Sequence, residues 1–434
     1  MWVLSIVLIV VSVIIVKYRN NAPKEFKQLL AARDLAAAFG LLTATDMVTI
    51  LERCYAPSLY QDGIARTYIG GASGVMISNP EYFKEVLSKT GTFPKLAVSD
   101  SHYSLLNKLV GENIVFANGK DWKLRRELIN PLFRMGWEPA SFGSVILDFF
   151  ETIEKVDSSP DLYHAMELIT LDTLGNILFG FDFQAIRNPK GEHVVSYSAA
   201  AIAAYDMLYI SIPILDRFPF GSRSQGHHAV KHFRQMLSNL ALKKSEEIQN
   251  ASTEREKGPR DLLTVYAQAW LDKRMEFESI IDDIITMIIA GHDTTANALA
   301  CTIYLLAKHS EAQDKVREEI SRVFESHTST KEIPSTKEIK SLPYLEAVIR
   351  ESMRLYPSGP ILPTRTTAHD TSLGSIPIPK GTIITFNIYA MHRSDKYWDH
   401  PEEFNPDRWL TPGGQVQDLP AWGPFTGGER LCIG

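Results

Sequence analysis

The feature that most constrains the fold is a long apolar segment with a polar centre, residues 278–308 (ESIIDDIITMIIAGHDTTANALACTIYLLAK). Its hydrophobic residues recur around every side of a helix, so we expect one long helix that runs through the protein core. The polar centre extends from Ala290 to Thr295. A helix N-cap would explain Asp293 and Thr294, but caps belong at helix ends. A membrane span is the other alternative, but several polar side chains at mid-depth would be costly there.

The residue types at this polar centre favour a functional site. Gly291 lacks a side chain and would allow a flat ligand to approach the backbone. The Thr294 hydroxyl can donate to the carbonyl of Ala290, one turn earlier, and open the helix locally. Asp293 adds an ionisable group in apolar surroundings. An acid next to an alcohol above a ligand surface is the minimum needed to relay protons into a site that is poor in water.

The rest of the sequence predicts a mostly α-helical protein with small β regions, an α+β fold. Helical pattern dominates from about residue 120 to 320, and strand patterns occur at 64–70, 74–78 and 361–388. Asn79-Pro80 is typical of a helix start. We find no internal repeat and no linker, so we expect residues 21–434 to form one domain.

A second helix pattern, residues 344–357, ends at Pro357 and carries Glu351 and Arg354 on one face. Such a pair is usually a surface salt bridge that contributes little. Apolar residues flank this pair, so we expect partial burial, and a buried pair needs further hydrogen bonds. Arg408, in the segment FNPDRW, can provide them. We interpret Glu351, Arg354 and Arg408 as a structural triad rather than as catalytic residues.

The glycine-rich segment FTGGERLCIG, residues 425–434, surrounds Cys432. A zinc ligand is one alternative, but no second Cys or His lies within metal spacing. A phosphatase-type nucleophile would need a phosphate-binding loop after the cysteine, and an inert cysteine would not need this context. Gly427, Gly428 and Gly434 permit a turn whose N–H groups point at the sulfur, and Arg430 would also stabilise a thiolate. A lone thiolate that faces a proton relay is the protein half of a haem-thiolate site.

Charge and cysteine content exclude several classes of protein. The net charge of −6 argues against a nucleic-acid-binding protein, which would carry a basic face. The three cysteines, Cys54, Cys301 and Cys432, are odd in number and far apart. This pattern argues against a disulfide-stapled secreted protein and favours a reducing compartment.

The N-terminus, residues 1–20, is predicted to be a membrane anchor. Residues 2–16 are apolar apart from two serines, and Lys17 and Arg19 follow. Fifteen helical residues span roughly 22 Å, which flanking residues can extend toward the ~30 Å hydrocarbon core. The positive charges place the rest of the chain in the cytosol. A cleaved signal peptide and a buried strand are the alternatives, but the charges follow the apolar run instead of preceding it.

Taken together, these motifs resemble the cytochrome P-450 monooxygenase family. The resemblance extends from about residue 60 to 434, with the motifs in the family's order, and is closest to the eukaryotic microsomal type, with a fungal source expected. LDTLGNILFGFDF (171–183) resembles a further recurring helix of the family. The other matching positions are Trp122 and Arg126 of GKDWKLRR, residues 290–295 (AGHDTT), Glu351 and Arg354, Arg408 of FNPDRW, and Phe425, Gly428, Arg430, Cys432 and Gly434 of FTGGERLCIG.

The resemblance implies a haem cofactor with Cys432 as its axial thiolate. Asp293 and Thr294 would deliver protons to bound O2. Arg365 is matched by its place eleven residues after Arg354. The resemblance assigns the haem-propionate contacts to Trp122, Arg126, Arg365 and Arg430, because carboxylates prefer bidentate arginine partners. By this carry-over the haem-binding residues are Trp122, Arg126, Ala290, Gly291, Arg365, Phe425, Gly428, Arg430, Cys432 and Gly434.

The resemblance also implies partners. The chain has no G-x-G-x-x-G after a strand, so electrons would come from an NADPH-dependent flavoprotein reductase. Lys120, Lys123, Arg125 and Arg134 could form a basic patch for that partner, or could be ordinary solvated charges. Three segments, 95–116, 200–214 and 358–363, are expected to line the substrate pocket with the helix face near Ala290 and Thr294. They are apolar, which suggests a lipophilic substrate such as a steroid, a fatty acid or an aromatic compound.

The family continues beyond its cysteine motif into a helix and a strand hairpin, whereas this sequence ends at Gly434. We therefore expect weak or absent haem retention by the 434-residue chain. Three hypotheses follow: an active monooxygenase of which this is a fragment, a haem-thiolate isomerase or dehydratase without a reductase, and a non-enzymatic remnant. The acid–alcohol pair Asp293–Thr294 argues against the second.

Overall fold

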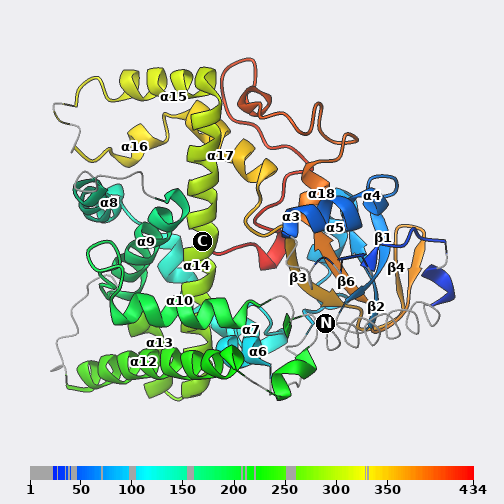
Figure 1. Cartoon of the computed structure of the whole chain (residues 1–434), viewed down its shortest axis with the longest axis horizontal. Helices are drawn as coiled ribbons and strands as arrows, with labels where there is room; N and C mark the ends of the chain where they lie inside the picture. The colour runs from blue at the N-terminus through cyan, green and yellow to red at the C-terminus, as the bar shows by residue number, and fades with distance from the viewer. Residues whose placement is uncertain are drawn as a thin grey trace.

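The computed structural model describes residues 23–434 except 27, 35, 38–39, 41–45, 70–71, 97–103, 154–160, 207–208, 211–212, 219–220, 251–260, 328 and 330–331. The described chain is mostly helical and contains two small sheets, which confirms the predicted fold class. Figure 1 shows the strands at one side of the molecule and most helices at the other, with α14 (Phe277–Lys308) running between them.

The larger sheet joins strands from the two ends of the sequence. Its strand order is β1-β2-β6-β3, and the smaller sheet pairs β4 with β5. β2 pairs antiparallel with β1 and parallel with β6, and β6 pairs antiparallel with β3. The bounds are β1 (Ile64–Ile69), β2 (Ala72–Ile77), β3 (Ile361–Thr366), β4 (Thr371–Leu373), β5 (Ile376–Ile378) and β6 (Ile383–Asn387). The two β-rich regions predicted from the sequence therefore meet in one sheet.

The helices cover the remainder of the fold. α5 starts at the predicted Asn79-Pro80, where the Asn79 side chain accepts a hydrogen bond from the N–H of Glu81 at 2.8 Å. Besides α14, the α-helices of the described residues are α3 (Met47–Ile50), α4 (Ala56–Leu59), α5 (Pro80–Ser88), α6 (Leu105–Val110), α7 (Gly119–Met135), α8 (Pro139–Ile153), α9 (Leu162–Leu174), α10 (Glu192–Ala204), α12 (Ser222–Asn250), α13 (Leu262–Leu271), α15 (Ser310–Val323), α16 (Thr336–Ile339), α17 (Pro343–Leu355) and α18 (Ile388–His392).

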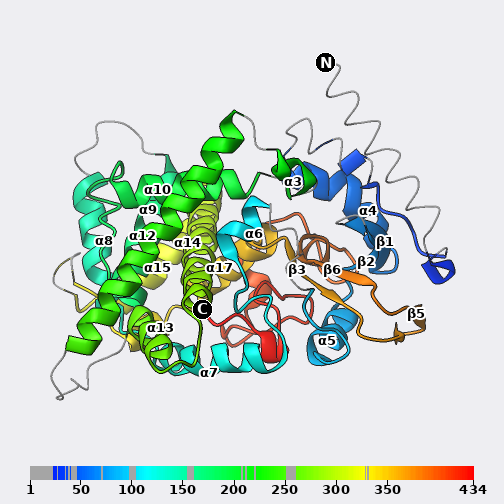
Figure 2. The ribbon, with the colours of Figure 1, turned by 90° about the horizontal axis from the view of Figure 1, so that it is seen from below.

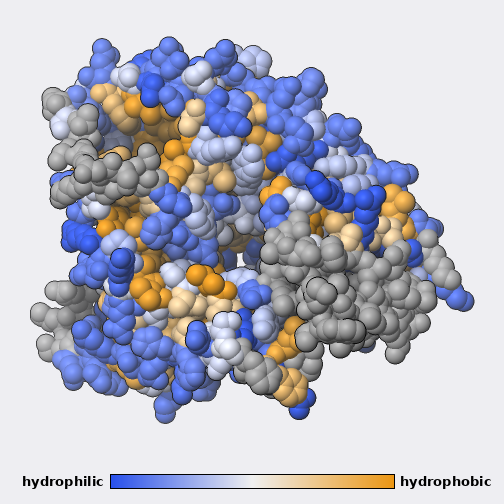
Figure 3. Space-filling model, in the orientation of Figure 1, coloured by the Kyte–Doolittle hydropathy of each residue, from blue (hydrophilic) through white to orange (hydrophobic). Residues whose placement is uncertain are grey.

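The prediction of a long central helix is confirmed almost to the residue, since 278–308 was expected and Phe277–Lys308 is observed. α14 packs against α9, α12 and α17, and Figure 2 shows the same central position from below. Residues 280–288 are buried on every side, within a core that also contains α10, α12 and α13. The second half differs from the prediction, because Leu299, Ile303 and Tyr304 are exposed. Figure 3 shows hydrophobic surface on this side of the molecule, between α15 and α10.

The predicted membrane anchor, residues 1–20, lies outside the described residues. Among the helices that the structure describes, none combines the length and the hydrophobicity that a membrane crossing requires.

Candidate functional site

The polar centre of α14 contains the predicted threonine contact. The Thr294 hydroxyl donates to the Ala290 carbonyl oxygen at 2.6 Å. Ala290 and Thr294 are both exposed, so they share a face of α14 that protein side chains leave open. A hydroxyl that bonds back to the previous turn loosens the local helix ladder. The predicted hydroxyl contact is therefore present, whereas the local helix opening predicted with it is not observed, since α14 is a continuous helix from Phe277 to Lys308.

Gly291 does not lie on this open face. A Cβ at this position would come within 2.7 Å of Cδ1 of Leu174 on α9. The missing side chain thus accommodates the packing of α9 against α14, which are extensively in contact. The expectation that Gly291 makes room for a flat ligand stays a prediction.

Asp293 and His292 point toward other helices. The Tyr197 hydroxyl, on α10, donates to Oδ1 of Asp293 at 2.7 Å. His292 is buried, and its Nδ1 lies 2.8 Å from Oγ1 of Thr170 on α9. Burial lowers the pKa of His292 to about 4, so its ring is neutral near pH 7. Burial also raises the pKa of Asp293, and the hydrogen bond from Tyr197 acts in the opposite direction.

The segment after α17 is tied to the same turn of α14. The Ser358 hydroxyl donates to the carbonyl oxygen of Thr294 at 2.8 Å, and the Asn297 amide donates to Ser358 at 3.3 Å. These contacts bring one predicted pocket wall, 358–363, beside Thr294. The other two predicted walls, 95–116 and 200–214, include residues outside the described part of the chain.

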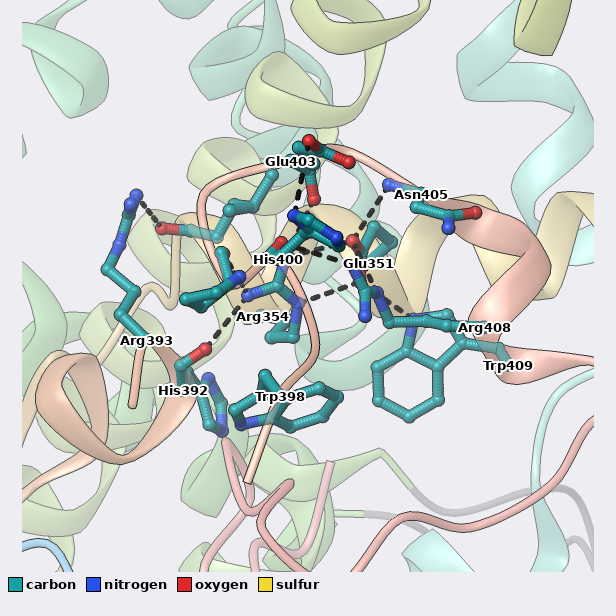
Figure 4. A network of polar contacts seen from close by, with 12 residues as sticks. Glu351, Arg354, His392, Arg393, Trp398, His400, Glu403, Asn405, Arg408 and Trp409 are labelled. Atoms are coloured by element: carbon teal, nitrogen blue, oxygen red, sulfur yellow. Dashed lines mark hydrogen bonds and ion pairs between the residues drawn. The ribbon is translucent and has the colours of Figure 1, made fainter. Parts of the chain in front are cut away.

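The structural triad forms as expected (Figure 4). Arg354 donates to both carboxylate oxygens of Glu351, at 2.8 and 2.9 Å, and neither side chain has exposed surface. Arg408 Nε donates to Oε1 of Glu351 at 3.1 Å, and Trp409 Nε1 donates to Oε2 at 2.9 Å. The remaining Arg354 donors reach the carbonyls of His392, Pro401 and Glu403. This supplies the extra hydrogen bonds that a buried ion pair requires and holds the chain before the cysteine segment in place.

The cysteine segment folds as a turn with a single 3-10 turn, Gly428–Arg430. The N–H of Cys432 donates to the carbonyl oxygen of Phe425 at 3.0 Å, which closes the turn, and Cys432 is exposed. Gly428 has φ of +66°, and a Cβ there would lie 3.0 Å from the carbonyl oxygen of Leu87. Both observations explain why glycine is needed at this position. Gly434 lies near the Phe133 ring of α7, and Phe425 is partly exposed next to Trp422.

Three cations gather beside this turn: Lys95, Arg365 and Arg430. The Arg430 guanidinium carbon lies 4.0 Å from the ring centroid of Trp122 on α7. Lys95 and Arg365 are joined by a backbone bridge, and the Asn118 side chain holds the main chain of Lys95 through two bonds of 3.0 Å. None of the three cations forms an ion pair with a carboxylate of the described residues.

The surroundings of these three cations disfavour their protonated, charged forms. Burial lowers the pKa of Arg365 and of Arg430 to about 10. Burial, together with the charges of Arg365 and Arg430, lowers the pKa of Lys95 to about 7. Arg365 Nη1 donates to the Phe93 carbonyl, and Arg430 Nη2 donates to the Ala117 carbonyl. Their other donors are buried without a partner: Nε and Nη2 of Arg365, and Nε and Nη1 of Arg430.

Arg125 and Arg126 are neighbours on α7, but only Arg125 is buried in the protein interior. Arg126 lies on the cysteine side of α7: burial lowers its pKa, and the neighbouring Cys432 sulfur opposes that effect. Arg125 is buried instead, and its Nη1 lies 2.8 Å from Oδ1 of Asp283 on α14. Its inclusion in the basic patch was therefore wrong, whereas Lys120, Lys123 and Arg134 are exposed.

Sequence reasoning missed Lys95 and Tyr197. Lys95 stood at the start of a predicted pocket wall, and its position as a lone cation between apolar segments was the available signal. Tyr197 carried no signal, because its partner Asp293 is 96 positions away. Within the described chain, no three His, Cys, Asp or Glu side chains are grouped so as to hold a metal ion.

Comparisons with known proteins match most of the chain. The family model described as Cytochrome P450 matches residues 52–434. A chloroplastic Arabidopsis thaliana protein, LUTEIN DEFICIENT 5, is 28% identical over 86% of this chain and 64% of its own length. The chloroplastic carotene epsilon-monooxygenase of Arabidopsis thaliana is 29% identical, over 86% of this chain and 70% of its own length. Cytochrome P450 monooxygenase 205 of Postia placenta is 30% identical, with 80% of this chain and 71% of that protein covered.

The chain thus spans about two thirds of the length of these curated relatives. Other relatives come from mammals and from a bacterium. Because the matches extend over plants, animals, fungi and bacteria, they establish neither a fungal source nor a microsomal type.

Proposed function

The chain belongs to the cytochrome P450 family, and on that premise we propose that it is a haem-thiolate monooxygenase with Cys432 as the iron ligand. The observation that carries the proposal is the set of unpartnered donors on Arg365 and Arg430, buried beside the Cys432 turn. Buried donors without partners are rare in folded proteins and mark a place where a ligand is expected.

The cation cluster fits the carboxylates of haem. Two guanidinium groups with free donors and one ammonium group, none of which forms an ion pair with a described carboxylate, match a ligand with two carboxylates. Arginine forms bidentate contacts with such groups. Haem carries two propionate carboxylates, which Arg365, Arg430 and Lys95 would bind, with Trp122 supporting Arg430. Arg126 would help to stabilise the Cys432 thiolate.

Bound haem would supply the activation of O2 that inserts one oxygen atom into a substrate C–H bond. The chain's own residues hold and move protons at this site. Thr294 presents its hydroxyl on the open face of α14, and Asp293 is the ionisable group next to it. We assign Asp293 and Thr294 to proton delivery, which needs groups positioned within reach of the reacting oxygen.

We propose a lipophilic substrate. The open face of α14 and the segment at Ser358 carry few charges, and apolar walls bind apolar ligands. One relative is named for carotene, a hydrocarbon. Binding spectra with a panel of steroids, fatty acids and carotenoids test this, and a preference for charged, hydrophilic compounds would contradict it.

For electron supply we propose an NADPH-dependent flavoprotein reductase that docks on the exposed cations Lys120, Lys123 and Arg134. Electrostatic docking implies that reduction slows as salt increases. A double variant, Lys120→Glu with Lys123→Glu, should slow reduction by the reductase without affecting chemical reduction. We also propose anchoring in the endoplasmic reticulum membrane through residues 1–20, and alkaline extraction of membranes tests whether the chain stays with the lipid.

A titration with haem and with haem dimethyl ester tests the proposed haem site. The ester lacks both carboxylate charges but keeps the ring and the iron. Each lost charge-assisted hydrogen bond costs about 1.5–3 kcal/mol, so the ester should bind at least about tenfold more weakly. In Arg365→Met the two ligands should differ less. Equal binding of both ligands by the wild-type chain would contradict the assignment of the cation cluster.

A further inference from the structure

The carboxylate of Asp293 is turned away from its neighbour Thr294. Successive side chains on an α-helix diverge by about 100°. Thr294 lies on the open face and donates back to Ala290, whereas Asp293 reaches α10, where the Tyr197 hydroxyl donates to its Oδ1 at 2.7 Å. The Asp293 carboxyl group, which is proposed to supply protons, belongs to α14 but is held by a residue of α10.

The titratable groups around Asp293 come from three helices and a helix end. On α14, His292 Nε2 lies 3.5 Å from Oδ1 of Asp293. On α9, the charge of Glu167 raises the pKa of Asp293. The charge of Asp293 in turn adds to burial in raising the pKa of Tyr163, also on α9, and of Tyr205, just after α10. His292 is engaged with Thr170 and neutral, as its pKa is lowered to about 4.

Tyr197 is suited to be a permanent donor. Its side chain is buried and packs edge-to-face on Phe233 and His292, with ring centroids at 5.7 and 5.0 Å. Burial and the charge of Asp293 raise the pKa of Tyr197, so it keeps its proton at all physiological pH values. A hydrogen bond to a carboxylate stabilises its ionised form.

We propose that Tyr197 is a positioning residue, which holds the Asp293 carboxyl group toward α10 and sets the pH range over which this group serves Thr294. The proposal rests on the function proposed above for Asp293. The pKa of Asp293 is subject to two opposing effects. Burial raises it, and the hydrogen bond from the Tyr197 hydroxyl lowers it. Glu167, on the facing helix, acts in the same direction as burial.

The direct test is the titration of Asp293 in the full chain without added haem. Aspartate labelled with carbon-13 at the carboxyl group is followed by NMR against pH, and the Asp293 signal is assigned by its loss in Asp293→Asn. Tyr197→Phe removes the hydroxyl and keeps the ring contacts. We expect the Asp293 midpoint to move to higher pH in Tyr197→Phe. An unchanged midpoint overturns the proposal.

Tyr205→Phe is the matched control, because the same hydroxyl is removed near Asp293 without loss of a hydrogen bond to it. Its Asp293 midpoint should stay close to that of the wild type. An equal shift in both variants would show a general field effect and would also overturn the proposal.

A second readout separates this inference from the proposed function. In the haem-loaded chain, the pH profile of product formed per O2 consumed should shift upward in Tyr197→Phe, in step with the NMR midpoint. If Asp293→Asn leaves coupling unchanged, the proposed role of Asp293 fails, although the NMR shift in Tyr197→Phe would still stand. If Asp293→Asn uncouples but Tyr197→Phe moves neither midpoint nor profile, the inference alone fails.

Discussion

The guanidinium group of Arg430 lies over the ring of Trp122, 4.0 Å from its centroid, although the two residues are far apart in the sequence. This stacking joins the cysteine segment to α7, and the Nε and Nη1 donors of Arg430 are buried there without a partner among the described residues. Trp122 matters here as a surface for Arg430, in addition to any contact with a ligand.

Replacement of Trp122 by leucine should weaken haem binding, because Arg430 loses the ring that orients it. A cation–π contact contributes about 0.5–2 kcal/mol, so the dissociation constant should rise by roughly 2- to 30-fold. Trp122→Phe keeps an aromatic face and should lose less. Titration of each purified variant with haem measures this, and equal loss in both variants would argue against stacking as the cause.

Replacement of Lys95 by methionine should stabilise the haem-free chain near and below pH 7. The folded-state pKa of Lys95 is lowered to about 7 from 10.5, so the unfolded chain binds more protons between these values. The cost of the buried charge is complete below about pH 7 and disappears above about pH 10.5. Urea unfolding at pH 6.5, 8 and 10 should show a gain for Lys95→Met that shrinks as the pH rises.

Lys123→Met is the control for that series, because Lys123 is exposed on α7. Its stability difference from the wild type should be small, because an exposed ammonium group stays in contact with water. A Lys95→Met variant that behaves like this control would show that the Lys95 ammonium carries no burial cost. The same Lys95→Met variant should bind haem more weakly than the wild type.

Replacement of Glu351 by glutamine should destabilise the fold strongly. The amide cannot neutralise Arg354, which would remain buried with no charge opposite it. Loss of one partner of a buried ion pair costs about 3–5 kcal/mol of unfolding free energy. Glu346→Gln breaks the exposed pair with Arg350 and should cost no more than about 1 kcal/mol. Denaturant unfolding of both variants compares them, and similar costs would contradict the buried triad.

Replacement of Thr294 by alanine should separate O2 consumption from product formation. A positioned proton donor contributes roughly 10²–10⁴-fold, so product per O2 should fall by about tenfold or more. Thr302→Ala is the matched control, because the Thr302 hydroxyl makes the same back-bond, to the Ala298 carbonyl at 2.7 Å, two turns away. Equal uncoupling in both variants would assign the effect to helix geometry instead of to the Thr294 hydroxyl.

The sequence predicted those features that depend on residues close together in the chain, such as helix bounds and contacts within one helix. The bounds of α14 follow from its apolar pattern, and the Thr294–Ala290 bond follows from helix geometry. The Glu351–Arg354 pair is three residues apart on one helix, so its formation was also predictable. Burial of that pair followed from its apolar neighbours.

Contacts between distant segments could not be predicted in this way. The sequence predicted that Asp293 and Thr294 act together in proton delivery. The hydrogen bond from Tyr197 to Asp293 was not predictable, because it depends on how α10 packs on α14. Arg125 and Arg126 are neighbours in a basic segment, yet only packing against Asp283 makes the first an interior residue. Gly291 is explained by Leu174 on α9, and Lys95 joins the site through its bridge to Arg365.

The central claim is that Cys432 provides a thiolate to haem iron. The most direct test is the absorption spectrum of the full chain, saturated with haem, reduced and exposed to carbon monoxide, next to that of Cys432→Ser. We predict that, at a haem concentration high enough to saturate even a weak site, the wild-type chain gives a long-wavelength, thiolate-type Soret band and Cys432→Ser does not. A wild-type spectrum without that band, or one that Cys432→Ser reproduces, would contradict the assignment of Cys432.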